Sequence, residues 1–227
     1  MPVLVRNILI LAAIALGFGA VSLARESKIR IPGTDQGYAP EQPIAFSHRL
    51  HAGELEIDCQ FCHAGAEKSR HAGLPPVATC MGCHRFVGAP ANDIRVEEAR
   101  AQAESRPARP IVSSEIMKIY RAMGLDSALR RDSSMEAADN GIGRPGIRWA
   151  RVHNLADFVF FDHSRHVNGG VACSACHGAV ETMERIEQVS DLTMGTCVNC
   201  HREKNAEFHA QGGKLDRASI DCSSCHI

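Results

Sequence analysis

Every cysteine of this 227-residue chain lies in a Cys-x-x-Cys-His motif, and the motif occurs five times. Two cysteines three positions apart on one turn can form thioethers to the two vinyl groups of one haem, and the imidazole that follows then lies beneath the iron. The sequence therefore predicts five covalently bound haem c groups. The predicted attachment residues are Cys59, Cys62, Cys80, Cys83, Cys173, Cys176, Cys197, Cys200, Cys222 and Cys225, and the predicted proximal iron ligands are His63, His84, His177, His201 and His226.

Zinc ribbons and thioredoxin-like proteins also contain Cys-x-x-Cys pairs. Two such pairs bind one zinc ion through four thiolates, so five pairs are an odd number for zinc, and zinc gives no reason for a histidine after each pair. A thioredoxin-like motif is expected once, next to a βαβ pattern. The repeated histidine therefore favours haem attachment over both alternatives.

Seven further histidines are available for the opposite, distal faces of the irons. Four of them form a repeated Phe-x-His-x-x-His pattern upstream of haem motifs, His48 with His51 and His163 with His166. Imidazoles three positions apart project from the same side of a helical turn at different heights, so each pair can reach two different haems. His153 is the fifth candidate. With these five, every iron would have histidine on both faces.

A methionine on one distal face is the alternative. A thioether ligand raises the reduction potential relative to two imidazoles, so one His/Met haem would suit the point where electrons leave. Met194 and Met183 are the methionine candidates, and His71 is a further histidine candidate. His71 and His209 each lie alone in a polar stretch, where a histidine without a metal is the ordinary interpretation.

The composition is typical of a chain organised around cofactors. Eight Phe, two Tyr and one Trp are few aromatic residues for a length that allows one or two domains. Five flat cofactors would supply the missing apolar volume, so the expected fold class is mostly irregular with short α-helices. The net charge of -1 gives no indication of nucleic-acid binding. Haem c attachment implies maturation on the outer side of the cytoplasmic membrane.

The N-terminal residues 1–25 are predicted to form a membrane anchor or an uncleaved signal helix. The apolar run from Ile8 to Ala24 lies between the length of a signal-peptide core and the roughly 17 to 25 residues of a spanning helix. Ser22-Leu23-Ala24 would also serve as a cleavage site, so removal is the alternative. We expect a single-pass anchor in the cytoplasmic membrane, with the haem domain on the periplasmic side.

The rest of the chain is predicted to divide into four segments. Residues 26–43 are rich in Pro and Gly and form a tether. Residues 44–87 and 147–227 are two copies of one haem module, with two and three haem motifs respectively. Internal repetition of this kind arranges several cofactors along one chain. Residues 88–146 form a partly helical insert between the modules.

Two helices are predicted in the insert. Ser113 or Ser114 can cap a helix whose apolar residues recur at helical spacing, and Gly124 ends it. The polar stretch from Asp93 to Glu104 is rich in Ala and Glu, which indicates a solvated helix or arm. We expect the first of these helices to pack on its own domain.

Several stretches resemble the pentahaem cytochrome subunit of alternative complex III, a bacterial quinol oxidase unrelated to the cytochrome bc complexes. The likeness covers most of the chain and rests on residues 46–53, 57–63, 72–84, 114–124, 152–166 and 192–197. The resemblance implies a cytochrome c3-like multihaem domain with one N-terminal membrane helix. By position, the family's distal-ligand motifs match His48, His51, His153, His163 and His166.

The resemblance also implies partners and a function. The partners are an iron-sulfur subunit and polytopic quinol-binding membrane subunits. Electrons from quinol oxidation would pass through the five haems to another c-type cytochrome, a copper protein or a terminal oxidase, with no bond chemistry in this chain. Two other functions fit the motifs: a subunit of a multihaem reductase, which needs an iron with an open position, and a free-standing, membrane-tethered electron shuttle.

Overall fold

The structure is a computed structural model that describes residues 3–26, 35–131, 146–214 and 217–226. Over these residues it consists of helices joined by irregular chain, and strand pairing is limited to two isolated bridges. This agrees with the predicted fold class. The elements in chain order are α1 (Val3–Glu26), η1 (Arg49–Glu54, a π-helix), α2 (Cys59–Cys62), α3 (Val77–His84), α4 (Ala91–Ala103), α5 (Ser114–Ala122), α6 (His163–Asn168), α7 (Ser174–His177), η2 (Val180–Thr182, a 3-10 helix), α8 (Met194–Ala210) and α9 (Cys222–Cys225).

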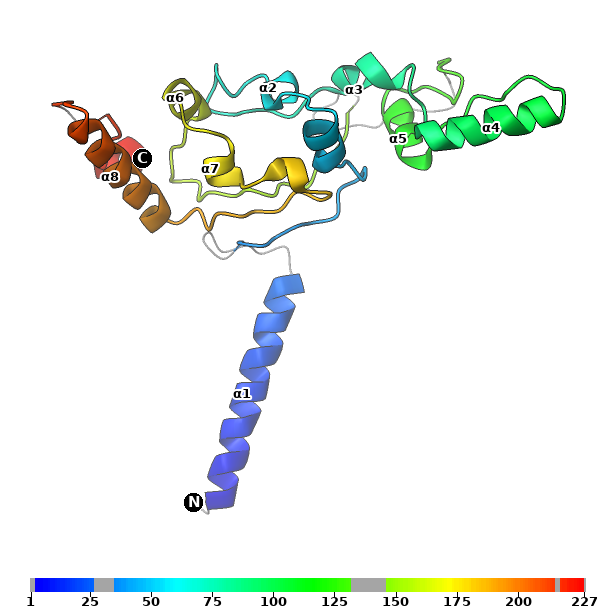
Figure 1. Cartoon of the computed structure of the whole chain (residues 1–227). Coiled ribbons are helices and arrows are strands. Elements are labelled where there is room, and N and C mark those ends of the chain that lie inside the picture. Colours follow the sequence, from blue (N-terminus) through cyan, green and yellow to red (C-terminus); the bar gives the residue numbers. More distant parts are fainter. Residues whose placement is uncertain (1–2, 27–34, 132–145, 215–216, 227) are drawn as a thin grey trace.

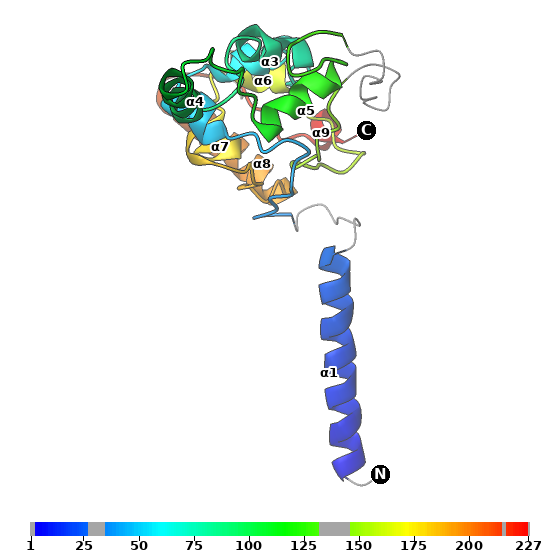
Figure 2. The same ribbon diagram turned by 90° about the vertical axis from the view of Figure 1, so that its right-hand side faces the viewer.

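The haem motifs lie in an elongated body, and α1 extends away from it (Figures 1 and 2). Within the described part of the chain, no helix is both long enough and apolar enough to cross a membrane. The predicted anchor over residues 1–25 is therefore not supported. Parts of the predicted tether and insert, residues 27–34 and 132–145, lie outside the described residues, and the division into segments stays a prediction.

Helix α5 joins the insert to the first module (residues 44–87). The Ser113 hydroxyl caps the helix by accepting a hydrogen bond from the Ile116 N–H (3.2 Å), as predicted. The Tyr120 hydroxyl donates to the His84 carbonyl at the end of α3 (2.6 Å). The buried apolar core at this point consists of Ile44, Val77, Ile119, Tyr120 and Ala122. The insert helix thus packs on α3, which carries a haem motif.

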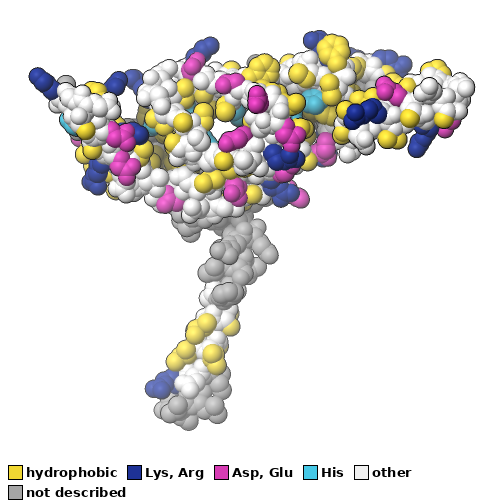
Figure 3. All heavy atoms as spheres, in the orientation of Figure 1, with side chains coloured by type: hydrophobic (Ala, Val, Ile, Leu, Met, Phe, Trp, Pro, Cys, Tyr) yellow, Lys and Arg dark blue, Asp and Glu magenta, His cyan; other side chains and the backbone are white. Residues whose placement is uncertain are grey.

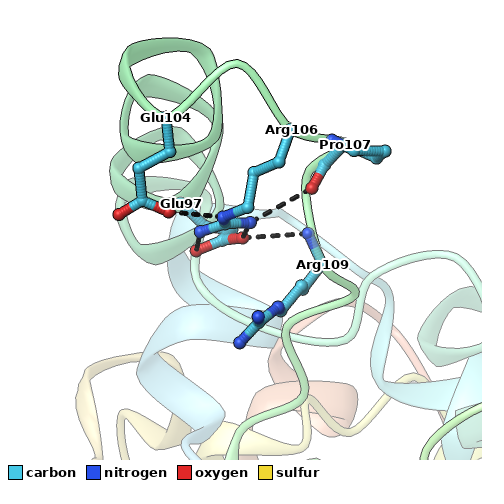
Figure 4. Close-up of polar contacts among 5 residues, drawn as sticks. All are labelled: Glu97, Glu104, Arg106, Pro107 and Arg109. Carbon is cyan, nitrogen blue, oxygen red and sulfur yellow. Dashed lines mark hydrogen bonds and ion pairs between the residues drawn. The ribbon is translucent and has the colours of Figure 1, made fainter.

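The polar helix predicted at residues 93–104 is α4, which projects from one end of the body as an arm (Figure 1). Glu97 is buried at 7% exposure and accepts hydrogen bonds from the Arg106 guanidinium (2.6 Å) and the Arg109 N–H (2.9 Å) (Figure 4). These bonds, Arg106 first, lower the pKa of Glu97 to about 2. The chain after α4 is therefore folded back along the helix, and charges of both signs cover the arm (Figure 3).

The two modules, residues 44–87 and 147–227, interlock. Three backbone carbonyls of the first module accept hydrogen bonds from α6 of the second. The pairs are Asn168 Nδ2 to Glu67 (3.0 Å), Ser164 N–H to Ser69 (3.2 Å) and His163 N–H to Arg70 (3.3 Å). η1 also packs against η2, where a Cβ atom at Gly53 would collide with the Glu181 carbonyl, so glycine permits this close approach.

Candidate haem-binding sites

The five motifs all lie on helical turns and are numbered sites 1 to 5 in chain order. Site 1 is Cys59–His63 at α2, site 2 is Cys80–His84 at α3, site 3 is Cys173–His177 at α7, site 4 is Cys197–His201 at α8 and site 5 is Cys222–His226 at α9. A helical turn brings residues three apart to the same side, so both sulfur atoms of a motif can bond to one cofactor. All ten thiols are free.

Three of the five proximal histidines hold the ring tautomer that a metal ligand needs. Nδ1 lies close to a backbone carbonyl in each of them: His63 with Gly73 (2.7 Å), His84 with Val87 (2.9 Å) and His201 with Ser219 (2.5 Å). Because a carbonyl oxygen only accepts, Nδ1 carries the proton and Nε2 keeps its lone pair for iron. His177 differs from these three, because its Nδ1 lies 3.1 Å from Nε2 of His153.

Three of the predicted distal histidines face proximal ones. The ring centres are 6.2 Å apart for His51 and His84, 6.4 Å for His163 and His177, and 6.1 Å for His166 and His201. An imidazole nitrogen binds a metal ion at about 2 Å, so two ring centres on opposite sides of one ion lie about 6 Å apart. The spacing therefore fits two imidazoles on one iron at sites 2, 3 and 4.

The three distal rings also have the ligating tautomer. Their Nδ1 atoms donate to the backbone carbonyls of Ser47 for His51 (2.9 Å), Arg70 for His163 (2.8 Å) and Asp162 for His166 (2.8 Å). Arg70 belongs to the first module, whereas His163 belongs to the second. The distal ring at site 3 is therefore oriented by the neighbouring module.

His48 lies close to site 1. Burial, followed by the nearby rings of His63 and His51, lowers the pKa of His48 to about 4. Its Nδ1 is buried and has no hydrogen-bond partner among the described residues. A neutral imidazole next to His63 is what the distal face of site 1 requires.

Site 5 has a different environment. His226 stacks with Phe158 (5.8 Å between ring centres, 30°) and forms the bridge to Val159. His153, the fifth predicted distal ligand, lies against His177 of site 3. Of the remaining candidates, Met194 is exposed at the start of α8, Met183 follows η2 and His71 is exposed in the loop after site 1. The distal ligand of site 5 therefore stays a prediction.

Neighbouring thiols place the sites in the spatial order 2, 1, 3, 4, 5. Cys83 of site 2 neighbours Cys62 of site 1, and Cys59 of site 1 neighbours Cys173 of site 3. Cys176 of site 3 neighbours Cys200 of site 4, and Cys197 of site 4 neighbours Cys225 of site 5. Burial first, and these neighbours second, raise the pKa of Cys62, Cys59 and Cys176. Helices α3, α2, α7 and α8 follow one another across the body in the same order (Figure 1).

The surroundings of the sites suit a flat apolar cofactor. Large apolar side chains beside the motifs are exposed, namely Phe61, Leu74, Phe86, Phe158 and Ile220. A flat apolar cofactor attached at each motif could cover such side chains. Free thiol pairs, facing imidazoles and these apolar flanks together fit covalent haem.

Two contacts in the sites had no signal in the sequence. The Arg70 carbonyl that orients His163 is a backbone group, which every residue possesses, so no side-chain pattern marks it. The His153 to His177 contact joins residues 24 positions apart through a fold with few regular elements. The motif around His153 indicated a function for that histidine without indicating which site it serves.

Comparisons with known proteins agree with the geometry. Residues 159–227, which include sites 3 to 5, match the family model described as cytochrome c7 and related cytochrome c. A stretch of 137 residues, 60% of this chain, is 30% identical to the menaquinone reductase multihaem cytochrome c subunit of Nitratidesulfovibrio vulgaris (strain Hildenborough). The match covers 46% of that relative, so the chain spans about half its length. Together with the repeated attachment motifs and the facing imidazoles, these matches support a multihaem c-type cytochrome.

Proposed function

We propose that this chain relays electrons through five covalent haems, from a membrane complex that oxidises quinol to a periplasmic acceptor, as in alternative complex III. The observation that carries the proposal is the series of imidazole pairs with ring centres 6.1 to 6.4 Å apart. When bound, c-type haems supply one-electron redox chemistry. The described residues supply the attachment, the axial ligands and the spacing.

At sites 2, 3 and 4, the imidazole pairs favour a relay over the site of a multihaem reductase. A reductase needs an iron with an open position for its substrate, whereas His51, His163 and His166 lie opposite the proximal rings of their sites. Closing both faces of an iron leaves electron transfer as its chemistry. The spatial series of sites supports the same function, because each site has a neighbour to which an electron can pass.

The two ends of the series are the expected places for partners. Site 2 lies beside α5 at the end of the body that carries the α4 arm, and site 5 lies at the C-terminal end (Figure 1). We propose that an iron-sulfur subunit and polytopic quinol-binding subunits deliver electrons at one end. A c-type cytochrome, a copper protein or a terminal oxidase would accept them at the other end.

The opposite direction of electron flow is a second candidate, which the menaquinone reductase relative favours. In that case a periplasmic donor would reduce this chain, and the membrane subunits would pass the electrons to menaquinone. Both directions place the haem modules on the periplasmic side of the cytoplasmic membrane, since haem c is attached outside the cytoplasm.

The haem count is tested first. The intact mass of the purified native chain should correspond to five haem additions, and peptide mass spectrometry should find a haem on each motif. A count of four or fewer with an unmodified motif would contradict the five-haem proposal. A variant with Cys222→Ser and Cys225→Ser should lose one haem and keep the other four.

The complex is tested by isolating the chain from native membranes in mild detergent and identifying its partners by mass spectrometry. Co-isolation with iron-sulfur and polytopic subunits, and reduction of the haems by added quinol, are the expected results. Oxidation of the reduced haems by added menaquinone, without reduction by quinol, would favour the second candidate. Recovery of the chain alone would instead indicate a free-standing shuttle.

A further inference from the structure

The proximal ring at site 3 has a hydrogen-bond partner of a different kind from its counterparts. At sites 1, 2 and 4, the proximal Nδ1 faces a backbone carbonyl. At site 3, Nδ1 of His177 faces Nε2 of His153 at 3.1 Å, and the rings meet edge to face with centres 4.4 Å apart at 82°. An imidazole nitrogen thus takes the place of a carbonyl oxygen.

Buried contacts hold the segment that carries His153. Val152 is 7% exposed, and the Asn154 N–H donates to Oε1 of Gln188 (3.4 Å). Gln188 is fully buried at 0% exposure, and its backbone N–H donates to the Tyr38 carbonyl (3.0 Å). The His153 ring is therefore positioned by a segment that is fixed on both sides.

The proton in this contact has one arrangement that is compatible with an iron at site 3. His177 binds iron through Nε2 if its Nδ1 carries the proton, so His177 donates and His153 Nε2 accepts. A ring nitrogen accepts a hydrogen bond only through its lone pair, so His153 is a neutral ring in this arrangement, with its own proton on Nδ1. The facing ring of His163 occupies the opposite side of the site, 6.4 Å from His177 between ring centres.

We propose that His153 is a positioning residue for site 3, which orients His177 and increases the basicity of its imidazole, and that it is not a distal iron ligand. A second ring nitrogen is a better acceptor than a peptide carbonyl, so the His177 ring gains more negative character than its counterparts. A more basic axial ligand stabilises ferric iron over ferrous iron. The haem at site 3 should consequently have a lower reduction potential than the same site without His153.

The proposal rests on a haem at site 3, which peptide mass spectrometry of the Cys173 motif establishes independently. The test uses the full-length holoprotein with His153→Leu, which removes the acceptor, and His153→Gln, which keeps an acceptor oxygen. His209→Leu is the matched control, because His209 is exposed near the end of α8 and is not among the predicted iron ligands. Each protein is titrated potentiometrically, and its spin states are recorded by low-temperature electron paramagnetic resonance.

We expect His153→Leu to raise the potential of one haem and His153→Gln to raise it less, with no high-spin iron in either variant that the unchanged protein lacks. His209→Leu should change no potential. A His163→Met background marks site 3 by changing its distal ligand, so it identifies the haem whose potential moves.

A new high-spin iron in His153→Leu would overturn the proposal and make His153 an iron ligand. Unchanged potentials in both His153 variants would also overturn it, leaving His153 with a packing function alone. If His153→Leu fails to assemble with its full haem content, His153→Gln decides the question. A raised potential at site 3 in His153→Gln would support the proposal, and an unchanged potential would overturn it.

Discussion

The two haem modules share a local design and differ in what surrounds it. In each, the Phe of the Phe-x-His-x-x-His motif stacks on the second histidine and meets the first edge-on. The distances between ring centres are 4.3 Å for Phe46 and His51, 4.5 Å for Phe161 and His166, 4.9 Å for Phe46 and His48, and 4.8 Å for Phe161 and His163. The repeated sequence thus produces the same arrangement of rings twice.

The surroundings diverge at the ring nitrogens. His48 has a buried Nδ1 without a described partner, whereas Nδ1 of its counterpart His163 donates to the Arg70 carbonyl. His63 donates to a carbonyl, whereas its counterpart His177 contacts His153. The motif determines ring geometry, and long-range contacts determine the chemical character of each ring.

The largest expected effect tests the shared design. Replacing His51 or His166 with Ala should convert one low-spin iron to high-spin in each variant, because each ring faces a proximal histidine at the spacing of one iron. Low-temperature electron paramagnetic resonance measures the change. Since the ring geometry is the same in both modules, the two variants should lose equal low-spin intensity. An unchanged low-spin count in either would contradict the assigned pair.

The second-largest expected effect is a loss of stability that should differ between the two modules. Ile119 is 5% exposed in the apolar core that supports α3 of the first module. Ile119→Ala should lower the free energy of unfolding by about 2 to 5 kcal/mol, the usual cost of such a truncation in a core. Denaturant titration of the holoprotein measures it. Glu181→Ala, at an exposed position of the second module, should change it by less than about 0.5 kcal/mol.

Helix caps give a smaller test of the same difference. The Ser113 hydroxyl caps α5 at 3.2 Å, and the Thr193 hydroxyl caps α8 of the second module at 3.4 Å. Ser113→Ala should cost about 1 kcal/mol of unfolding free energy. Thr193→Ala should cost less, because its longer bond is weaker. A larger loss for Thr193→Ala in the same denaturant titration would show that α8 depends on its cap more than α5 does.

The smallest effect is confined to the α4 arm. The pKa of Glu97 is lowered from 4.5 to about 2, so its charged form stabilises the arm above pH 4.5, and this stabilisation is lost as the pH falls toward 2. The protection factors of the α4 amides, which are exchange rates corrected for the intrinsic pH dependence of amide exchange, should fall over that window. In Glu97→Gln these protection factors should be lower at neutral pH and depend less on pH. Haem spectra of both modules should stay unchanged over the upper part of the window.

The sequence predicted the parts of this structure that depend on side-chain type and short spacing. The attachment turns, the cap at Ser113 and the polar helix α4 follow from local patterns and are present. The predicted anchor at residues 1–25 depended on a run of borderline length, and no described helix supports it.

The spatial order of the sites could not be predicted, because it depends on how the modules interlock. Chain order places site 2 between sites 1 and 3, whereas neighbouring thiols place site 1 there. That exchange follows from the backbone bonds between residues 67–70 and α6. Backbone groups are the same in every residue, so no sequence pattern encodes their pairing.

The bond from His163 to the Arg70 carbonyl makes the two halves of this duplicated chain inseparable. A fragment comprising residues 147–227 alone would retain three attachment motifs and lack the backbone group that orients one of its own axial rings. Exchange of one repeat between related proteins would meet the same difficulty unless the loop around Arg70 were transferred with it. The second copy of the motif therefore depends on the first for the orientation of one of its rings.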